Sequence, residues 1–316
     1  MDPTLTRGDP EQNRALTPVE QALRVAVGIA TGHPAPPPEA VPPQARSLDV
    51  LPPTRVRELL EMVLVSSSPE PALQWLHDAG LLAVILPELE ATVDFTQEMG
   101  RRHKDVWKHT KQVVAQAEPD PVVRWAALLH DVGKVPTRTI SPAGKVAFHG
   151  HAEVGARMFD RISRRLAFPP DQGKQVRFLI QQHLRANQYD GSWTDSAVRR
   201  FDREMGEGLG ALLALSRADI TSARKHKRQA ALAQIEELVA RIHALREIDN
   251  RVPPLPSGLG NHIMERFKLQ PGRIIGDLRR HLASAVEAGA LEGQREVEYY
   301  LEYLEGLREG DGFRLG

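Results

Sequence analysis

The chain has 316 residues, of which 41 are basic and 41 are acidic, and it contains no cysteine. The zero formal charge gives no reason to expect a protein that coats nucleic acid or carries an acidic tail. The lack of cysteine excludes disulfide scaffolds, zinc ribbons, thiol catalysis and cysteine-ligated iron–sulfur clusters. Any metal must therefore be held by histidine and carboxylate side chains, and a cytoplasmic location is expected.

The first 53 residues hold 11 of the 24 prolines. This composition predicts a loose N-terminal arm, partly in the polyproline II conformation. One short helix is expected within it, because Thr17-Pro18-Val19-Glu20 is a capping box with proline at the first helical position. The apolar stretch 19–30 is too short and too polar to span a membrane, so no membrane association is expected.

Helical patterns follow one another from residue 54 onward. Asp120 is expected to cap a helix that has Pro121 at its first position. The clearest apolar stripe is Ala230, Leu232, Ile235, Leu238, Val239, Ile242 and Leu245. No convincing hairpin and no alternation of strands with helices stands out, so the predicted fold is all-α. We expect four parts: the arm at 1–53, neck-like helices at 54–100, a central domain at 101–250 and a helical tail at 251–316.

Charge is segregated along the chain although its sum is zero. Residues 101–111 and 217–228 each hold five basic residues and one acid, whereas residues 287–311 hold eight acids and two basic residues. Such runs are most often solvated helix faces. Each basic run lies beside a candidate metal ligand, however, which favours an anion site there.

The sharpest chemical signal is the doublet His130-Asp131 at the end of an apolar helix. Two neighbouring side chains can reach one metal only where a helix ends, and Gly133 is expected to supply the backbone freedom to turn. His109 lies upstream of the doublet and Asp219 far downstream. Together these residues make a mixed nitrogen and oxygen site for a divalent transition metal.

This arrangement resembles the HD-domain superfamily of metal-dependent phosphohydrolases. That family places a histidine, a His-Asp doublet and a distant aspartate on a helical bundle, which implies an HD helical bundle as the central domain here. The resemblance implies His109, His130, Asp131 and Asp219 as ligands of one metal. Lys134 matches the lysine of the family's HDxGK pattern, and its ammonium could hold a substrate phosphate. Asp131 and Lys134 are thus the implied catalytic residues.

Two further histidines match the ligands of HD proteins that hold two metals. His151 opens an HxxxG segment ending at Gly155, and His183 ends a predicted helix. With Asp131 bridging, the resemblance implies a second metal, so two ions are favoured over one. His149 is an alternative to His151, which is preferred because Gly155 follows at the family's spacing and would let the helix pack closely. The metal is divalent, and Mn, Fe, Ni, Co and Mg stay open because availability decides between them.

Residues 54–305 further resemble the body of bacterial CCA-adding enzymes and poly(A) polymerases. The matching segments are Ala79–Leu82, Ile85–Leu89, His103–Thr110 and Leu269–Gly276. Those polymerases carry an N-terminal nucleotidyltransferase head with an Asp-x-Asp metal site. The first 53 residues are too few and too rich in proline for such a head. We therefore expect an HD body with neck and tail, and not a nucleotidyltransferase.

The resemblance implies a hydrolase that cleaves a phosphoester of a nucleotide or at an RNA 3′ end, as a 2′,3′-cyclic phosphodiesterase or 2′-phosphatase. Lys134 and an arginine, Arg217 or Arg224, would bind the phosphate. Two alternatives stay open. One is a tRNA- or RNA-binding module with a vestigial HD site, and the other is a different HD hydrolase, acting on dNTPs or (p)ppGpp. The sequence does not reveal the oligomeric state.

Overall fold

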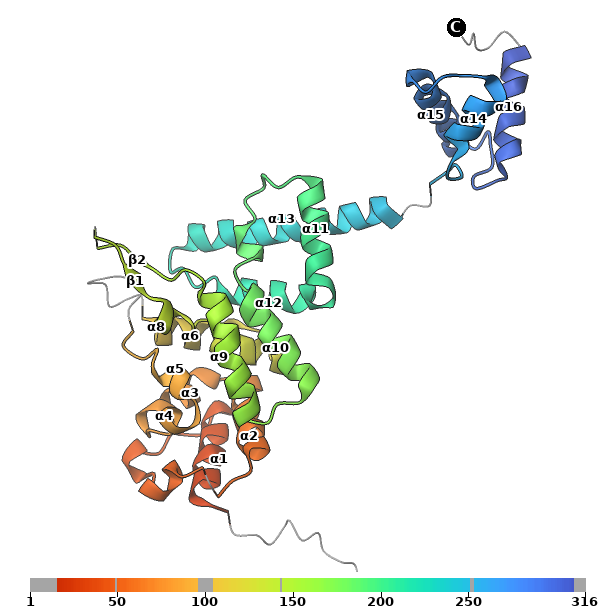
Figure 1. Ribbon diagram of the computed structural model, residues 1–316. Helices are drawn as coiled ribbons and strands as arrows, with labels where there is room; N and C mark the ends of the chain where they lie inside the picture. Colours follow the sequence, from red (N-terminus) through yellow and green to blue (C-terminus); the bar gives the residue numbers. More distant parts are fainter. Residues whose placement is uncertain (1–15, 49, 96–104, 143, 251–252, 310–316) are drawn as a thin grey trace, which may run out of the picture. The chain divides into compact units, whose positions relative to one another are not determined.

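The computed structural model describes residues 16–48, 50–95, 105–142, 144–250 and 253–309 (Figure 1). These residues fold into helices, with one hairpin of two short strands, so the predicted all-α fold is confirmed. In chain order the elements are α1 (Pro18–Ala30), η2 (Pro38–Ala40), η3 (Pro43–Arg46), α2 (Pro53–Val65), α3 (Pro69–Asp78), α4 (Leu82–Ile85), α5 (Pro87–Glu90), α6 (Val106–Gln116), α7 (Pro121–Leu129), α8 (Lys134–Thr137), β1 (Thr139–Ile140), β2 (Val146–Ala147), α9 (His151–Arg165), α10 (Pro170–Gln182), η5 (Ala186–Gln188), α11 (Asp195–Met205), η6 (Gly206–Gly208), α12 (Leu209–Asp219), α13 (Lys225–Asn250), α14 (Leu259–Phe267), α15 (Arg273–Glu287) and α16 (Val297–Glu309).

The chain forms two compact units, Met1–Ile242 and His243–Gly316. The expected division into arm, neck, central domain and tail stays a prediction. In the parts of the chain that the structure describes, no helix is both long and apolar enough to cross a membrane.

The proline-rich segment does not form a loose arm where the structure describes it. Helix α1 begins as predicted, with the hydroxyl of Thr17 accepting a hydrogen bond from the Glu20 amide at 3.3 Å. Its apolar face is buried against α2 and α3, which keeps α1 on the body. Further along, the indole of Trp75 donates to the carbonyl of Pro36 at 2.8 Å. Between α1 and α2 the described residues form only two short 3-10 helices, η2 and η3, yet the segment packs on the body.

Helix α7 is the centre of the first unit and packs against α2, α6, α10 and α12. It begins at the predicted cap, because the carboxylate of Asp120 accepts from the amide of Val123 at 2.9 Å. Every residue from Val123 to Leu129 is buried, so α7 is hydrophobic on all sides. The helix ends at Leu129, and the next two residues, His130 and Asp131, therefore lie among the surrounding helices.

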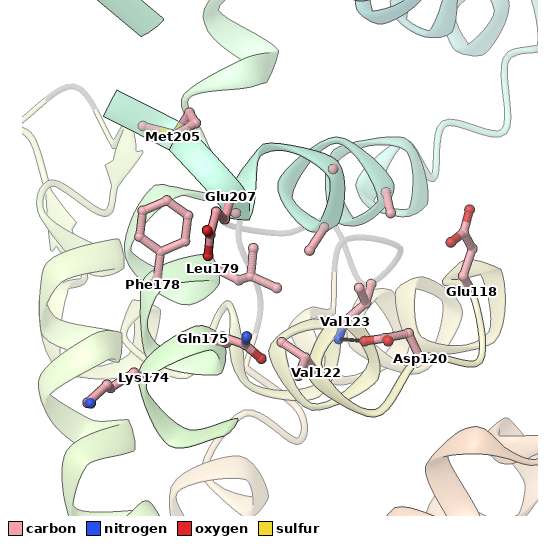
Figure 2. A pocket seen from close by; sticks show the side chains of 14 residues that line it. Glu118, Asp120, Val122, Val123, Lys174, Gln175, Phe178, Leu179, Met205 and Glu207 are labelled. Atoms are coloured by element: carbon pink, nitrogen blue, oxygen red, sulfur yellow. Dashed lines mark hydrogen bonds between the residues drawn. The ribbon is translucent and has the colours of Figure 1, made fainter. Parts of the chain in front are cut away.

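A groove of about 610 Å³ lies between the N-terminal parts of α7, α10 and α12. Figure 2 shows its apolar walls, which include Val123, Phe178, Leu179 and Met205. The predicted ligands carried by these helices lie at or just beyond their C-terminal ends. None of these ligands lines the groove. The groove is thus separate from the predicted metal site.

Gly133 lets the end of α7 meet the start of α9. Its φ of −68° is accessible to any residue, so the predicted need for backbone freedom is wrong. A Cβ atom at this position would lie 2.0 Å from the carbonyl oxygen of His151 and 2.7 Å from the amide nitrogen of Gly155. Glycine is required here for close approach, and that approach places Asp131 beside His151.

The hairpin connects α8 to α9 and extends from the body near α8 (Figure 1). Its strands pair antiparallel, with Thr139 opposite Ala147 and Ile140 opposite Val146. We expected no hairpin from the sequence. The missed signal is a short turn containing Gly144, which has a φ of +75°, between the β-branched pair Thr139-Ile140 and Val146.

The second unit contains α14, α15 and α16 around their own buried cluster. The cluster is formed by aliphatic side chains and a tyrosine: Leu255, Leu259, Ile263, Ile275, Leu278, Leu282, Leu291, Tyr300, Leu301 and Leu304. The hydroxyl of Tyr300 donates to the carbonyl of Glu292 at 2.8 Å, which satisfies its buried polar atom. Helix α15 starts directly after Pro271-Gly272.

Candidate metal centre

Five helices bring all six predicted ligands into one cluster in the first unit. They are His109 on α6, His130 and Asp131 after α7, His151 at the start of α9, His183 after α10 and Asp219 at the end of α12. Within the described residues, two sets of metal-ligand type are recognisable: His109, His130 and Asp131, and Asp131, His151 and His183. Asp131 belongs to both sets, which makes it the centre of the cluster.

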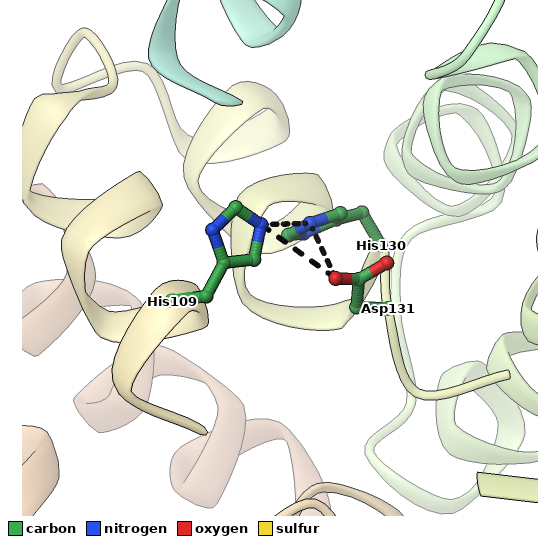
Figure 3. Close-up of side chains that lie close together, drawn as sticks. All are labelled: His109, His130 and Asp131. Atoms are coloured by element: carbon green, nitrogen blue, oxygen red, sulfur yellow. Dashed lines mark hydrogen bonds and ion pairs between the residues drawn. The ribbon is translucent and has the colours of Figure 1, made fainter. Parts of the chain in front are cut away.

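The first half-site consists of His109, His130, Asp219 and the Oδ2 atom of Asp131. Figure 3 shows His109, His130 and Asp131 of this set. The Nε2 atoms of the two histidines lie 3.3 Å apart. Asp219 Oδ1 lies 3.0 Å from His109 Nε2 and 3.6 Å from His130 Nε2. Asp131 Oδ2 lies 3.2 Å from His130 Nε2 and 3.6 Å from His109 Nε2. Two imidazole nitrogens and two carboxylate oxygens thus converge on one point.

The second half-site consists of His151, His183 and the Oδ1 atom of Asp131. The Nε2 atoms of His151 and His183 lie 3.3 Å apart, and Asp131 Oδ1 lies 3.6 Å from His151 Nε2. Each carboxylate oxygen of Asp131 therefore faces a different half-site. This is the arrangement that a carboxylate bridging two metals requires.

Three of the four histidines are oriented by the same local contact. The Nδ1 atom of His130 lies 2.8 Å from the carbonyl of Ala127, three residues earlier. The Nδ1 atoms of His151 and His183 make the same contact at 2.9 and 2.8 Å, again with the third carbonyl upstream. A carbonyl can only accept, so Nδ1 carries the proton and Nε2 keeps its lone pair for a metal.

His109 is oriented by a side chain instead. Its Nδ1 atom lies 3.0 Å from the hydroxyl of Thr221, two residues beyond Asp219. The amide of Gln116, also on α6, donates at 2.7 Å to the carbonyl of Ala218 and so holds the end of α12 against α6. Sequence reasoning did not identify Thr221, because nothing in the pattern indicates a contact across more than a hundred residues.

Burial and charge give the two half-sites different pKa values. Burial lowers the pKa of His130, but the carboxylates of Asp131 and Asp219 outweigh it and raise that pKa to about 8. Burial and the nearby charge of His130 lower the pKa of His183 to about 4. Burial also lowers the pKa of His151.

The two carboxylates stay ionised because neighbouring positive charges and hydrogen bonds outweigh the effect of burial. Burial raises the pKa of Asp219, but the hydrogen bond to His109 and the charge of His130 bring that pKa down to about 2. Burial likewise opposes ionisation of Asp131, but neighbouring His130 and Lys134 hold its pKa well below the ordinary value.

Lys134 is the predicted phosphate ligand that lies within the centre. Its Nζ atom is 2.6 Å from Asp131 Oδ2. Arg217 is directed elsewhere, because its guanidinium pairs with Glu236 on α13 at 2.7 Å. Arg224 is exposed, and no contact with the cluster is recorded for it among the described residues. The alternative ligand His149 is exposed as well, whereas His151 lies in the cluster.

The donor set suits divalent transition metals. Four imidazole Nε2 atoms and two carboxylates are hard to borderline ligands, and the second contacts already fix the orientation of the imidazoles. One buried and one half-buried carboxylate, gathered with four buried or half-buried histidines, form the kind of oriented donor set that a divalent ion fills. The residues therefore fit one or two divalent ions.

Two family descriptions match the chain. The HD domain family matches residues 90–235, and a family described as a probable RNA- and SrmB-binding site of polymerase A matches residues 39–92. The chain therefore contains an HD domain, the class of helical domain that binds divalent metals.

Curated relatives define the particular resemblance. The chain is 34% identical over 259 residues to the A-adding tRNA nucleotidyltransferase of Deinococcus radiodurans, which covers 78% of this chain and 57% of that protein. It is 31% identical over 302 residues to the CC-adding tRNA nucleotidyltransferase of Thermus thermophilus, which covers 92% of this chain and 66% of that protein. A multifunctional CCA protein of Pseudomonas paraeruginosa is 33% identical over 144 residues, which are 44% of this chain and 34% of that protein. The chain resembles the HD body and neck of CCA-adding enzymes, and it spans less than two thirds of each of these relatives.

Proposed function

We propose that this chain hydrolyses a phosphoester of a nucleotide or at an RNA 3′ end, as a 2′,3′-cyclic phosphodiesterase and 2′-phosphatase. The observation that carries the proposal is the pair of half-sites that share Asp131, with four Nε2 atoms directed inward. An HD domain supports a metal-dependent phosphohydrolase at the level of the superfamily. The RNA-binding segment and the tRNA-modifying relatives support an RNA end as the substrate.

Divalent ions bound here would supply Lewis acidity toward the phosphoryl group and a water of lowered pKa. The six ligands are proposed to hold two ions, one in each half-site, with Asp131 shared. Lys134 is proposed to hold a phosphoryl oxygen, because its ammonium lies at the bridging carboxylate. Arg217 could assist only if its ion pair with Glu236 opened, which leaves the exposed Arg224 as the alternative.

The second candidate function is RNA binding, and the match of residues 39–92 to an RNA-binding family favours it. We propose tRNA, or an RNA of similar shape, as the partner, with a cytoplasmic location to match. A vestigial HD site would not need six ligands with their imidazoles already oriented, so binding and hydrolysis are proposed together. We do not assign nucleotide addition to these residues, since the sequence contains no Asp-x-Asp pair.

The test is a substrate panel combined with elemental analysis. Purified protein is assayed on 2′,3′-cyclic AMP, 2′-AMP, 3′-AMP, dGTP and ppGpp, each with Mn, Ni, Co or Mg added. We expect turnover of the cyclic and 2′ phosphates by the wild type and none by Asp131→Asn. Bound metal without turnover of either would sink the proposed substrate class. Turnover of dGTP or ppGpp alone would assign a different HD activity, and a salt-sensitive tRNA gel shift by metal-free protein would favour the binding module.

A further inference from the structure

Two half-buried phenylalanines and two cations form a continuous series beside the metal centre. The Arg138 guanidinium lies 5.2 Å from the ring centroid of Phe95. The rings of Phe95 and Phe148 are 6.1 Å apart, inclined at 53°. The Lys134 ammonium lies 5.8 Å from the ring centroid of Phe148. We call these four side chains the cation–aromatic ladder.

The ladder is fixed to both half-sites through the backbone. The carbonyl of Phe148 is the acceptor for Nδ1 of His151, at 2.9 Å. The carbonyl of Phe95 accepts from the amide of Val106 at 3.0 Å, and Val106 is the first residue of α6, one turn before His109. Each ring therefore stands next to an element that carries a metal ligand.

One end of the ladder is the metal centre itself. Lys134 Nζ is 2.6 Å from Asp131 Oδ2, the carboxylate oxygen of the first half-site, and its ammonium also faces the ring of Phe148. A substrate whose phosphoester lay at Asp131 would therefore have the ring of Phe148 within the length of one nucleoside, with Phe95 next to that ring. In a nucleotide, the base lies one ribose away from the 2′ and 3′ oxygens.

The other end of the ladder has an unsatisfied donor. The Nε atom of Arg138 is buried and has no hydrogen-bond partner among the described residues. A buried N–H without an acceptor costs free energy, so its persistence indicates an acceptor that a ligand brings. A guanidinium is also the side chain best suited to phosphate oxygens.

Packing alone would not require this composition. Aliphatic side chains would fix the hairpin to the body equally well, whereas half-buried aromatic rings flanked by cations are typical of surfaces that stack nucleobases. Each of the two rings has a cation next to it. A base that packs on the rings would therefore have a positive charge nearby for its phosphates.

We propose that the cation–aromatic ladder is a nucleoside subsite of the metal centre. The base of the terminal nucleotide packs on Phe148 and Phe95, and Arg138 binds the 5′ phosphate that joins this nucleotide to the rest of the RNA. The inference rests on the proposed function, because it assumes that the cleaved phosphoester lies at Asp131. It adds a preference for substrates with a base, and for RNA ends over free nucleosides.

The first experiment compares variants across three substrates: 1-O-methylribose 2′,3′-cyclic phosphate, which lacks a base, 2′,3′-cyclic AMP, and the same nucleotide at the end of a dinucleotide. Phe148→Ala should raise KM about tenfold for both base-containing substrates, since stacking on one aromatic ring is lost. It should leave the abasic substrate unchanged. Arg138→Gln should raise KM about tenfold for the dinucleotide only, because only that substrate has a 5′ phosphate.

The second experiment measures binding without turnover. The fluorescence of 2-aminopurine riboside 3′-monophosphate should be quenched by wild-type protein with Mg²⁺, because stacking quenches this base, and quenching should be absent with Phe148→Ala. Phe148→Tyr should restore both quenching and KM. The matched control is Phe178→Ala, which removes a half-buried phenylalanine from the apolar groove and should change neither quantity. Metal content should be equal in all variants, since the carbonyl of Phe148 that binds Nδ1 of His151 is kept in each.

The outcomes separate this inference from the proposed function. If Phe148→Ala impairs all three substrates equally, or if quenching persists in that variant, the nucleoside subsite is wrong while hydrolysis stands. If no phosphoester is hydrolysed but quenching depends on Phe148 and is restored by tyrosine, the subsite stands and the proposed reaction is wrong.

Discussion

The two half-sites hold the same kinds of ligand but are assembled differently. The first uses α6, α7 and α12, with His109 and Asp219 separated by more than a hundred residues, and it has four protein donors. The second uses α9 and α10, which are consecutive in the chain, and it has three. Its histidines are oriented entirely by backbone carbonyls, whereas His109 depends on the side chain of Thr221. The first half-site should therefore bind its ion more tightly, and its orientation should be more sensitive to mutation.

Asp131→Asn should have the largest effect, because Asp131 belongs to both half-sites. We expect both ions to be lost and phosphoester hydrolysis to fall to background. In the metal-free protein the change also leaves Lys134 without its buried counter-charge and His130 with Asp219 alone, at a cost of about 3 kcal/mol in the free energy of unfolding. Elemental analysis and urea unfolding measure the two effects. Retention of one ion by this variant would show that Asp131 does not bridge.

His183→Ala and His109→Ala should separate the half-sites. His183→Ala should remove the ion of the second half-site and spare that of the first, since His183 contacts His151 but is not a ligand of the first set. His109→Ala should do the reverse, with the ion of the second half-site retained. Metal titration by calorimetry should give one binding event for each variant and two for the wild type. If His183→Ala binds as many ions as wild type and turns over substrate equally well, the assignment of His183 to a second metal is wrong.

Thr221→Val should have a smaller effect, confined to the first half-site. Valine keeps the shape of threonine but cannot bind Nδ1 of His109, so the imidazole loses its fixed orientation. We expect the affinity of the first half-site to fall about 10- to 100-fold and that of the second to be unchanged. The control is Thr137→Val, which removes a hydroxyl that donates to the carbonyl of Gly133, the residue before α8. A loss at both half-sites would show that Thr221 acts on the fold rather than on His109.

The sequence was sufficient for the all-α fold and for the residues that the structure gathers in the centre. His130-Asp131 is recognisable because neighbouring ligand types at a helix end are chemically distinctive, and the remaining ligands follow from the family's spacing. Helix starts at Thr17 and Asp120 were equally readable, since a cap is a contact between residues three apart.

Features that depend on tertiary contact could not be predicted in the same way. Gly133 has an ordinary φ, and its role follows only from the distance between its position and His151. The ion pair between Arg217 on α12 and Glu236 on α13 directs Arg217 away from the centre. In the sequence, each of these two residues looks like an ordinary solvated side chain. Phe95 and Phe148 lie more than fifty residues apart, and no spacing rule connects them.

The pH dependence of metal binding should distinguish the half-sites most finely. His130, with a pKa of about 8, is protonated at neutral pH in the metal-free protein, and an ion must displace that proton. The affinity of the first half-site should therefore fall about tenfold for each pH unit below about 8. His183, with a pKa of about 4, is already neutral at pH 6, and the lowered pKa of His151 acts in the same direction.

The second half-site should consequently bind with nearly constant affinity between pH 6 and 8. Titrations of His183→Ala and His109→Ala over this range report on each half-site separately, with proton release measured in buffers of different ionisation enthalpy. One proton should be released at the first half-site at pH 7 and close to none at the second. Equal proton release at both half-sites would mean that the proton is shared across Asp131 rather than held on His130. The two half-sites would then differ only in the number of their donors and in how their histidines are oriented.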